Sequence, residues 1–139
     1  MAGFRAGYVV GGPAEALLLA ELGPGLGVAT PAQAAIVTAL DPGGRALARM
    51  ARRRAGVAAE RARLERLLAG TRFSFAPSAA HFVWLRGDGL TGPDLAHDLA
   101  EQRIAVAPGT QWGDEEHVRV TLRDRAATQR LASALRSIA

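Results

Sequence analysis

The sequence contains neither cysteine nor lysine. The absence of cysteine excludes disulfides, thiolate metal ligands and cysteine nucleophiles, and it suits a cytoplasmic protein. Because lysine is absent, no side-chain amine of these 139 residues can form a Schiff base with a carbonyl compound. The two absences therefore remove several common forms of covalent catalysis from the chemistry that the chain itself can perform.

Long apolar runs are also missing. No stretch approaches the roughly 20 consecutive apolar residues of a membrane-spanning helix. Pro13 and Glu15 interrupt the apolar segment near the start of the chain, a pattern unlike that of a signal peptide. We therefore expect no membrane partner and a cytoplasmic location.

The charge is carried unevenly. All 17 basic residues are arginine, against 13 acidic residues, for a net charge of +4. The sequence pI of about 11.1 invites a nucleic-acid interpretation. The net charge is small, however, and aromatic residues make up only 5%, so base-stacking platforms are scarce. We expect no nucleic-acid partner, with a binding module for acidic partners as the alternative.

The first forty residues predict one strand and two short helices. Residues 4–10 are aromatic and β-branched and lie between glycines, which predicts a strand. Residues 14–22 predict a short helix. Thr30 is a candidate N-cap, followed by Pro31 and by Gln33 as the partner in a capping box, for a helix that runs to Leu40.

The remaining residues alternate between helix and strand patterns. A long amphipathic helix is expected over residues 43–69, with Gly70 as its stop. Thr91 and Asp124 are candidate N-caps of two further helices. The sequence predicts strands at 72–76, 80–85, 103–107 and 117–122, and the two capped helices from about 92 to 102 and from 125 to the C-terminus.

This order predicts an α+β small domain over residues 43–139. Its few-stranded, mostly antiparallel sheet should be covered by helices, with one long connecting helix. Residues 1–42 supply too little to close a sheet, because a lone strand leaves unpaired backbone groups on both edges. We expect this part to be the remnant of a larger domain, or to pair with its copy in a second chain.

Several segments occur in an order known from one enzyme superfamily. They are GFRAGYVVG, TPAQAAIVTAL, a long arginine-rich helix, FAPSAAHFVWL, IAVAPGTQWG and HVRVTL. Together they resemble the C-terminal half of the class I/II aminotransferases, which are fold-type-I pyridoxal-phosphate enzymes of the α/β class. The likeness is greatest to the branch that contains histidinol-phosphate aminotransferase.

The resemblance implies roles for two arginines. Arg5 occupies the position whose side chain contacts the phosphate of pyridoxal phosphate, and Arg119 the position that binds the α-carboxylate of the amino-acid substrate. A planar guanidinium suits both anions because it offers paired donors. The resemblance further implies amino transfer between an amino acid and a 2-oxo acid or related carbonyl, usually in a homodimer. The particular donor and acceptor stay open.

The three histidines do not predict a metal site. His81 stands where the family usually has asparagine, and it is either a substrate-specificity residue or a strand-edge histidine with a local hydrogen bond. His97 and His117 have no partners at metal-ligand spacing. We expect no metal.

The family's catalytic lysine lies upstream of the glycine-arginine segment. The resemblance therefore assigns no catalytic residue to this sequence, and we expect the isolated chain to be inactive in transamination. Three interpretations remain: part of a complete aminotransferase, one half of a split enzyme, or an independent, non-catalytic binding or interaction module.

Overall fold

The computed structural model describes residues 11–23, 27–40 and 45–138, together with Gly3 and Gly43. These residues belong to two compact units, Met1–Ala51 and Arg52–Ala139. The strand expected at residues 4–10, and Arg5 within it, lie outside the described residues. The assignment of residues 1–42 to a larger domain, with 43–139 as the small domain, stays a prediction.

The first unit contains short helices. A 3-10 helix, η2 (Pro13–Glu15), leads directly into α1 (Ala16–Glu21), and α2 covers Thr30–Leu40. The predicted N-cap of α2 is wrong, because the helix begins one residue earlier than a Thr30 cap requires. The carbonyl of Ala29 accepts from Gln33 N at 3.0 Å, so the helix already includes Thr30. Pro31 tolerates this shift because the first-turn N–H groups need no intrahelical partner.

Helix α3 (Arg45–Leu68) is the long helix that the apolar repeat predicted. Leu64 and Leu68 are buried, and Val57 packs against the same core. Gly70 adopts a left-handed φ of 76°, which confirms it as the residue that ends the helix. Among the described helices, none combines the length and the apolar composition needed to cross a membrane.

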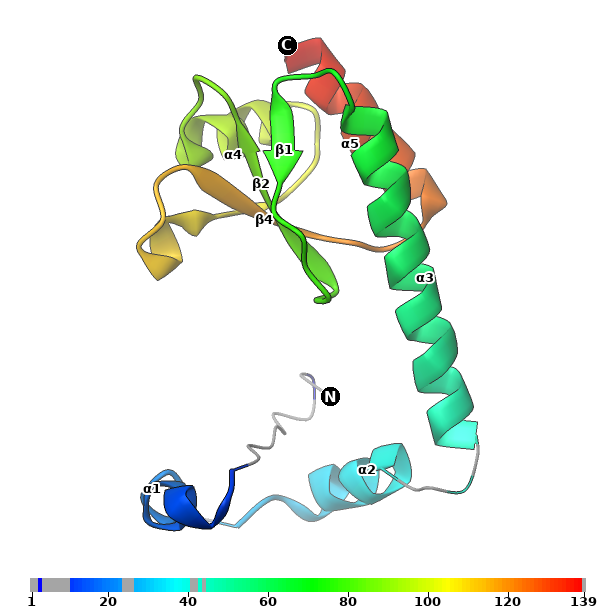
Figure 1. Cartoon of the computed structure of the whole chain (residues 1–139), viewed down its shortest axis with the longest axis vertical. Coiled ribbons are helices and arrows are strands. Elements are labelled where there is room, and N and C mark those ends of the chain that lie inside the picture. Colours follow the sequence, from blue (N-terminus) through cyan, green and yellow to red (C-terminus); the bar gives the residue numbers. More distant parts are fainter. Residues whose placement is uncertain (1–2, 4–10, 24–26, 41–42, 44, 139) are drawn as a thin grey trace. The chain divides into compact units, whose positions relative to one another are not determined.

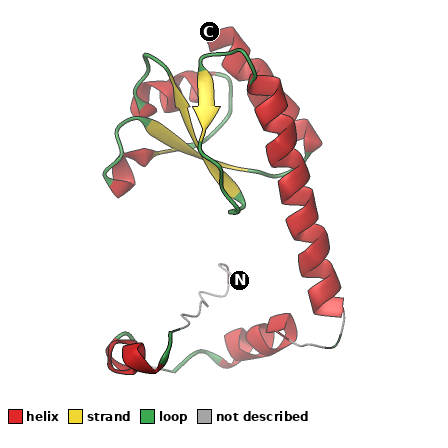
Figure 2. Cartoon of the chain, in the orientation of Figure 1, coloured by secondary structure: helices red, strands yellow, loops and turns green. Residues whose placement is uncertain are grey.

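The second unit is built on a four-stranded antiparallel sheet in the order β1-β2-β4-β3 (Figures 1 and 2). The strands are β1 (Phe73–Phe75), β2 (Phe82–Gly87), β3 (Ala107–Pro108) and β4 (His117–Thr121). The two central strands, β2 and β4, come from segments about thirty residues apart, so the sheet depends on long-range pairing.

Helices cover one face of this sheet. They are α4 (Gly92–Glu101), α5 (Arg125–Ile138) and the last turns of α3. Thr91 caps α4 by accepting from Asp94 N, and Asp124 caps α5 by accepting from Ala127 N, as predicted. The buried core residues are Leu64, Leu68, Phe73, Val83, Leu85, Leu95, Leu99, Val118, Val120, Leu122, Leu131, Ala132, Ala134 and Leu135. The predicted α+β architecture of this part is confirmed.

The strand expected at residues 103–107 is wrong for most of its length. Only Ala107 and Pro108 pair with β4. Ile104 and Val106 are partly buried against the core without joining the ladder, which explains their apolar alternation. The chain cannot start a strand at Arg103, because this residue has a left-handed φ of 59° at the end of α4.

Candidate functional site

The face of the sheet opposite the helices carries polar and aromatic side chains. In β4, Val118 and Val120 are buried, whereas His117 and Arg119 are half-buried on the other face. In β2, Phe82, Trp84 and Arg86 alternate in the same way with buried Val83, Leu85 and Gly87. We call this surface the open face, defined by Phe82, Trp84, Arg86, His117, Arg119 and Thr121.

Arg119 lies at the middle of the open face. It pairs in register with Trp84 of β2 on one side and with Ala107 of β3 on the other. Its Cζ lies 4.2 Å from the centroid of the Phe82 ring, within the range of a cation–π contact. In the described part of the chain, no carboxylate forms an ion pair with Arg119. Its charge is therefore available to an anionic ligand.

Aromatic rings cluster around Trp84, the cross-strand partner of Arg119. Trp84 makes edge contacts with Phe82 (centroids 6.4 Å apart), with Trp112 (5.4 Å) and with His117 (6.4 Å), each nearly perpendicular. Such edge-to-face geometry is one of the two arrangements that aromatic pairs favour. Trp112 is 54% exposed, so its ring adds solvent-accessible apolar surface beside Trp84.

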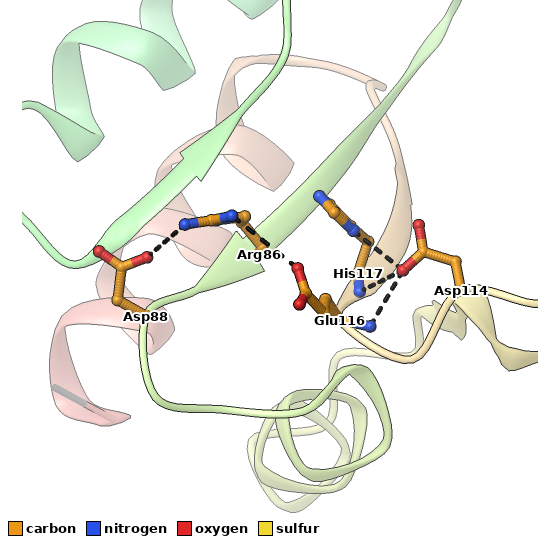
Figure 3. A network of polar contacts seen from close by, with 5 residues as sticks. All are labelled: Arg86, Asp88, Asp114, Glu116 and His117. Carbon is orange, nitrogen blue, oxygen red and sulfur yellow. Dashed lines mark hydrogen bonds and ion pairs between the residues drawn. The ribbon is translucent and has the colours of Figure 1, made fainter.

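The loop that carries Trp112 is held by Asp114. Its Oδ1 accepts from Glu116 N at 3.0 Å, from His117 N at 3.1 Å and from the His117 ring (Nδ1 3.0 Å away), as Figure 3 shows. The hydrogen bond from the His117 side chain is the largest cause that lowers the pKa of Asp114 below its ordinary value of 3.8. The carboxylate thus stays charged and fixes the start of β4.

Two glycines bring this loop close to its neighbours. A Cβ on Gly92, the first residue of α4, would lie 2.4 Å from the His117 carbonyl oxygen. A Cβ on Gly109 would lie 2.6 Å from the Asp114 carbonyl oxygen. Gly92 N also donates to Glu115 O at 2.8 Å. These backbone contacts make the loop part of the rigid scaffold that positions the open face.

Arg86 closes one end of the open face. It forms an ion pair with Asp88 at 2.9 Å and a longer one with Glu116 at 3.9 Å (Figure 3). Both partners are largely exposed, so each contact contributes little to stability. Because Arg86 is already paired with carboxylates, Arg119 is the open-face arginine better placed to bind an anion.

The structure describes some of the residues that the sequence singled out, but not all of them. Arg119 lies on the open face, whereas Arg5 lies outside the described residues, and the two roles that the resemblance implies for them stay predictions. His81 is exposed, and its ring makes an edge contact with Phe82 at 5.4 Å. The Nε2 atom of His97 lies 3.6 Å from Oε1 of Glu101, one helical turn further along α4. Throughout the described residues, no three His, Cys, Asp or Glu side chains are grouped as metal ligands would be.

Sequence reasoning missed the aromatic cluster. The apolar run HFVWL predicted a strand, but not that Phe82 and Trp84 lie on the open face beside Arg119. Their alternation with Val83 and Leu85 was the available signal. Which strand they pair with depends on long-range register, and this does not follow from local spacing.

Comparison with known sequences places the chain among characterised relatives. The family described as aminotransferase class I and II matches residues 1–135. The aromatic amino acid aminotransferase of Mycobacterium tuberculosis (strain H37Rv) is 37% identical over 123 residues, which is 88% of this chain and 32% of that protein. The enzyme of the same name from Mycobacterium avium is 33% identical over 122 residues, which is again 88% of this chain and 32% of that protein. The chain spans about a third of the length of these relatives.

Solved structures share the fold. A decarboxylase from Sulfurospirillum multivorans superposes with a TM-score of 0.69 over 90% of this chain and 33% of its own, at 22% identity. Histidinol-phosphate aminotransferase from Clostridium acetobutylicum gives a TM-score of 0.53 over 59% of this chain and 26% of its own, also at 22% identity. One fold here serves a decarboxylase and an aminotransferase, so the fold does not decide the reaction.

Proposed function

Because the chain belongs to the class I and II aminotransferase family, we propose that it supplies the substrate-carboxylate site of a pyridoxal-phosphate-dependent aminotransferase. The observation that carries this proposal is Arg119, a half-buried guanidinium on a rigid central strand, with no ion-pair partner among the described residues. A guanidinium binds a planar carboxylate through two parallel N–H donors. The Phe82 ring packs against this guanidinium in the range of a cation–π contact.

Pyridoxal phosphate, when bound, supplies the electron sink that stabilises charge on the substrate carbon. The described residues do not fit it as an attachment site, because the sequence has no lysine to form the Schiff base. Arg5, the proposed contact to the cofactor phosphate, lies outside the described residues. The part assigned to the described residues is therefore to bind and orient the amino acid.

Aromatic rings favour a substrate with a large apolar side chain. A ligand whose carboxylate is held by Arg119 has its other atoms near Trp84, the cross-strand partner of Arg119, and near Trp112. Rings that meet edge to face provide contact area for another aromatic group. We assign aromatic amino acids as the donor class, in line with the names of the mycobacterial relatives.

The complete enzyme in this proposal is a cytoplasmic homodimer without nucleic-acid or membrane partners. The 139-residue chain alone is inactive in transamination, because it has no lysine for the covalent step. The purified chain should show no amino transfer from L-phenylalanine to a 2-oxo acid in the presence of pyridoxal phosphate. Turnover by the purified chain would contradict this part of the proposal.

A chimera tests the function directly. Residues 1–135 replace the matching third of the M. tuberculosis enzyme, and amino transfer from L-phenylalanine is measured. We expect activity, and we expect kcat/KM to fall about 10- to 100-fold in the chimera with Arg119→Gln, because a hydrogen-bonded charge pair is lost. Arg53→Gln, an equal change of charge on an exposed position of α3, is the control.

The alternative, a non-catalytic binding or interaction module, predicts a different outcome. A chimera that folds, binds pyridoxal phosphate and forms dimers, yet transfers no amino group, would support that alternative and contradict the proposed function. Cofactor absorbance and light scattering establish folding and assembly before the assay is interpreted.

A further inference from the structure

A pocket of about 460 Å³ lies at the edge of the second unit's sheet. It is bounded by residues 103–107, by the end of β4 and by the first turns of α5. It forms because residues 103–106 leave the ladder, so that β3 pairs with β4 only at Ala107 and Pro108. Four arginines line it: Arg103, Arg119, Arg123 and Arg130.

The positive charge in this pocket is not compensated by its own lining. No aspartate or glutamate lines the pocket. Across the described residues, none of the four arginines takes part in an ion pair. The neighbouring carboxylate of Asp124 accepts from Ala127 N as the cap of α5. Guanidinium groups that share one concave site repel one another, and a bound anion relieves that repulsion.

Arg103 occupies a position at which glycine is usual. Its N–H donates to Ala100 O at 2.8 Å, and the next residue, Ile104, donates to Leu99 O at 2.9 Å. These two bonds form the helix ending in which the C′ residue is left-handed, and Arg103 has the corresponding φ of 59°. A side chain at this φ is less favourable than glycine, and the Arg103 side chain lines the pocket.

Arg130 fixes the wall of the pocket. Its Nη2 donates to the carbonyl oxygens of Gln102 and Arg103, each at 3.2 Å. This ties α5 to the turn that presents Arg103. A guanidinium has five N–H donors, so Arg130 retains others for a ligand.

We propose that Arg103, Arg123 and Arg130 bind a compact, multiply charged oxyanion of the phosphate or diphosphate type in this pocket. Three guanidiniums around one concavity suit the several oxygens of such an anion. Arg119 borders the same pocket, so the anion site adjoins the proposed carboxylate site. The inference does not depend on aminotransferase activity, because it concerns binding to the chain itself.

Calorimetric titration of the 139-residue chain with inorganic pyrophosphate tests the proposal, without amino acid or pyridoxal phosphate. We expect one saturable site, weakened at least about 10-fold by Arg123→Gln and by Arg103→Gly. The matched control, Arg53→Gln on exposed α3, removes the same charge outside the pocket and should leave the affinity unchanged. Titration with inorganic phosphate shows whether a single phosphate group is sufficient.

Arg103→Gly separates binding from folding. Glycine relieves the left-handed backbone, so this variant should unfold at a higher temperature than the original chain while binding pyrophosphate more weakly. Absence of saturable binding would overturn the inference, as would equal weakening by Arg53→Gln, which indicates attraction to the net charge alone. Either result leaves the chimera test of the proposed function unaffected.

Discussion

The Arg119 guanidinium lies over the ring of Phe82, with its Cζ 4.2 Å from the ring centroid. The two residues belong to neighbouring strands, β4 and β2, and are diagonal neighbours on the same face of the sheet, because Arg119 pairs with Trp84 and Phe82 pairs with Thr121. The contact holds the one open-face arginine that is free of carboxylates in the described part of the chain. We therefore expect the ring to influence how well Arg119 binds a substrate carboxylate.

Replacing Phe82 with leucine should raise the KM for L-phenylalanine in the chimera roughly 2- to 5-fold, the size expected from losing a cation–π contact. The guanidinium keeps its charge but loses its platform. The control is Ser74→Ala. Ser74 of β1 pairs with Arg86 and so lies on the same face of the sheet as Phe82, and this change should leave the KM unchanged. An unchanged KM for Phe82→Leu would show that the ring does not orient Arg119.

Asp114 should make the stability of the chain depend on pH. Its pKa is lowered, chiefly by the side-chain hydrogen bond from His117, so its folded-state pKa lies below the ordinary 3.8. The charged Asp114 therefore stabilises the folded chain above pH 3.8, and this stabilisation is lost as the pH falls through the lower pKa that Asp114 has in the folded state. Asp114→Asn removes the charge but keeps an oxygen acceptor.

Thermal unfolding of both proteins at several pH values tests this effect. The original chain should unfold at a higher temperature than Asp114→Asn near neutral pH, and the difference should shrink below pH 3.8 as Asp114 becomes protonated. A difference that stays constant from neutral pH to about pH 2 would contradict the assigned role of the charge.

Replacing glycine with alanine should have opposite effects on stability at Gly92 and at Gly56. Gly92→Ala places a Cβ 2.4 Å from the His117 carbonyl oxygen, which must move, and should destabilise the chain by about 1–3 kcal/mol. Gly56, inside α3, has no neighbouring atom within 4 Å of such a Cβ, so Gly56→Ala should stabilise it by about 0.5–1 kcal/mol. Urea unfolding measures the free energy of unfolding of both variants. A change of the same sign in the two would contradict the described contacts.

Local signals in the sequence predicted much of this architecture. Thr91 and Asp124 cap α4 and α5 as their side chains suggested, and Gly70 ends α3. The strand predicted at residues 117–122 forms as β4 (His117–Thr121). These features depend on spacing within a few residues, which a sequence displays directly.

The parts that sequence reasoning missed depend on distant contacts. Residues 103–107 alternate like a strand, but Arg103 is held in a left-handed turn after α4 and the ladder starts only at Ala107. The contact of Phe82 with Arg119 and the pocket beside α5 require the register of β2, β4 and β3. Register follows from how whole elements pack together, and no short motif specifies it.

The central claim is that Arg119 binds the carboxylate of the amino donor. The most direct measurement compares L-phenylalanine with 2-phenylethylamine, which lacks that carboxylate, in the chimera with and without Arg119→Gln. We predict that kcat/KM falls about 10- to 100-fold for the amino acid and stays unchanged for the amine. An unchanged kcat/KM for the amino acid, or an equal fall for both substrates, would contradict the claim.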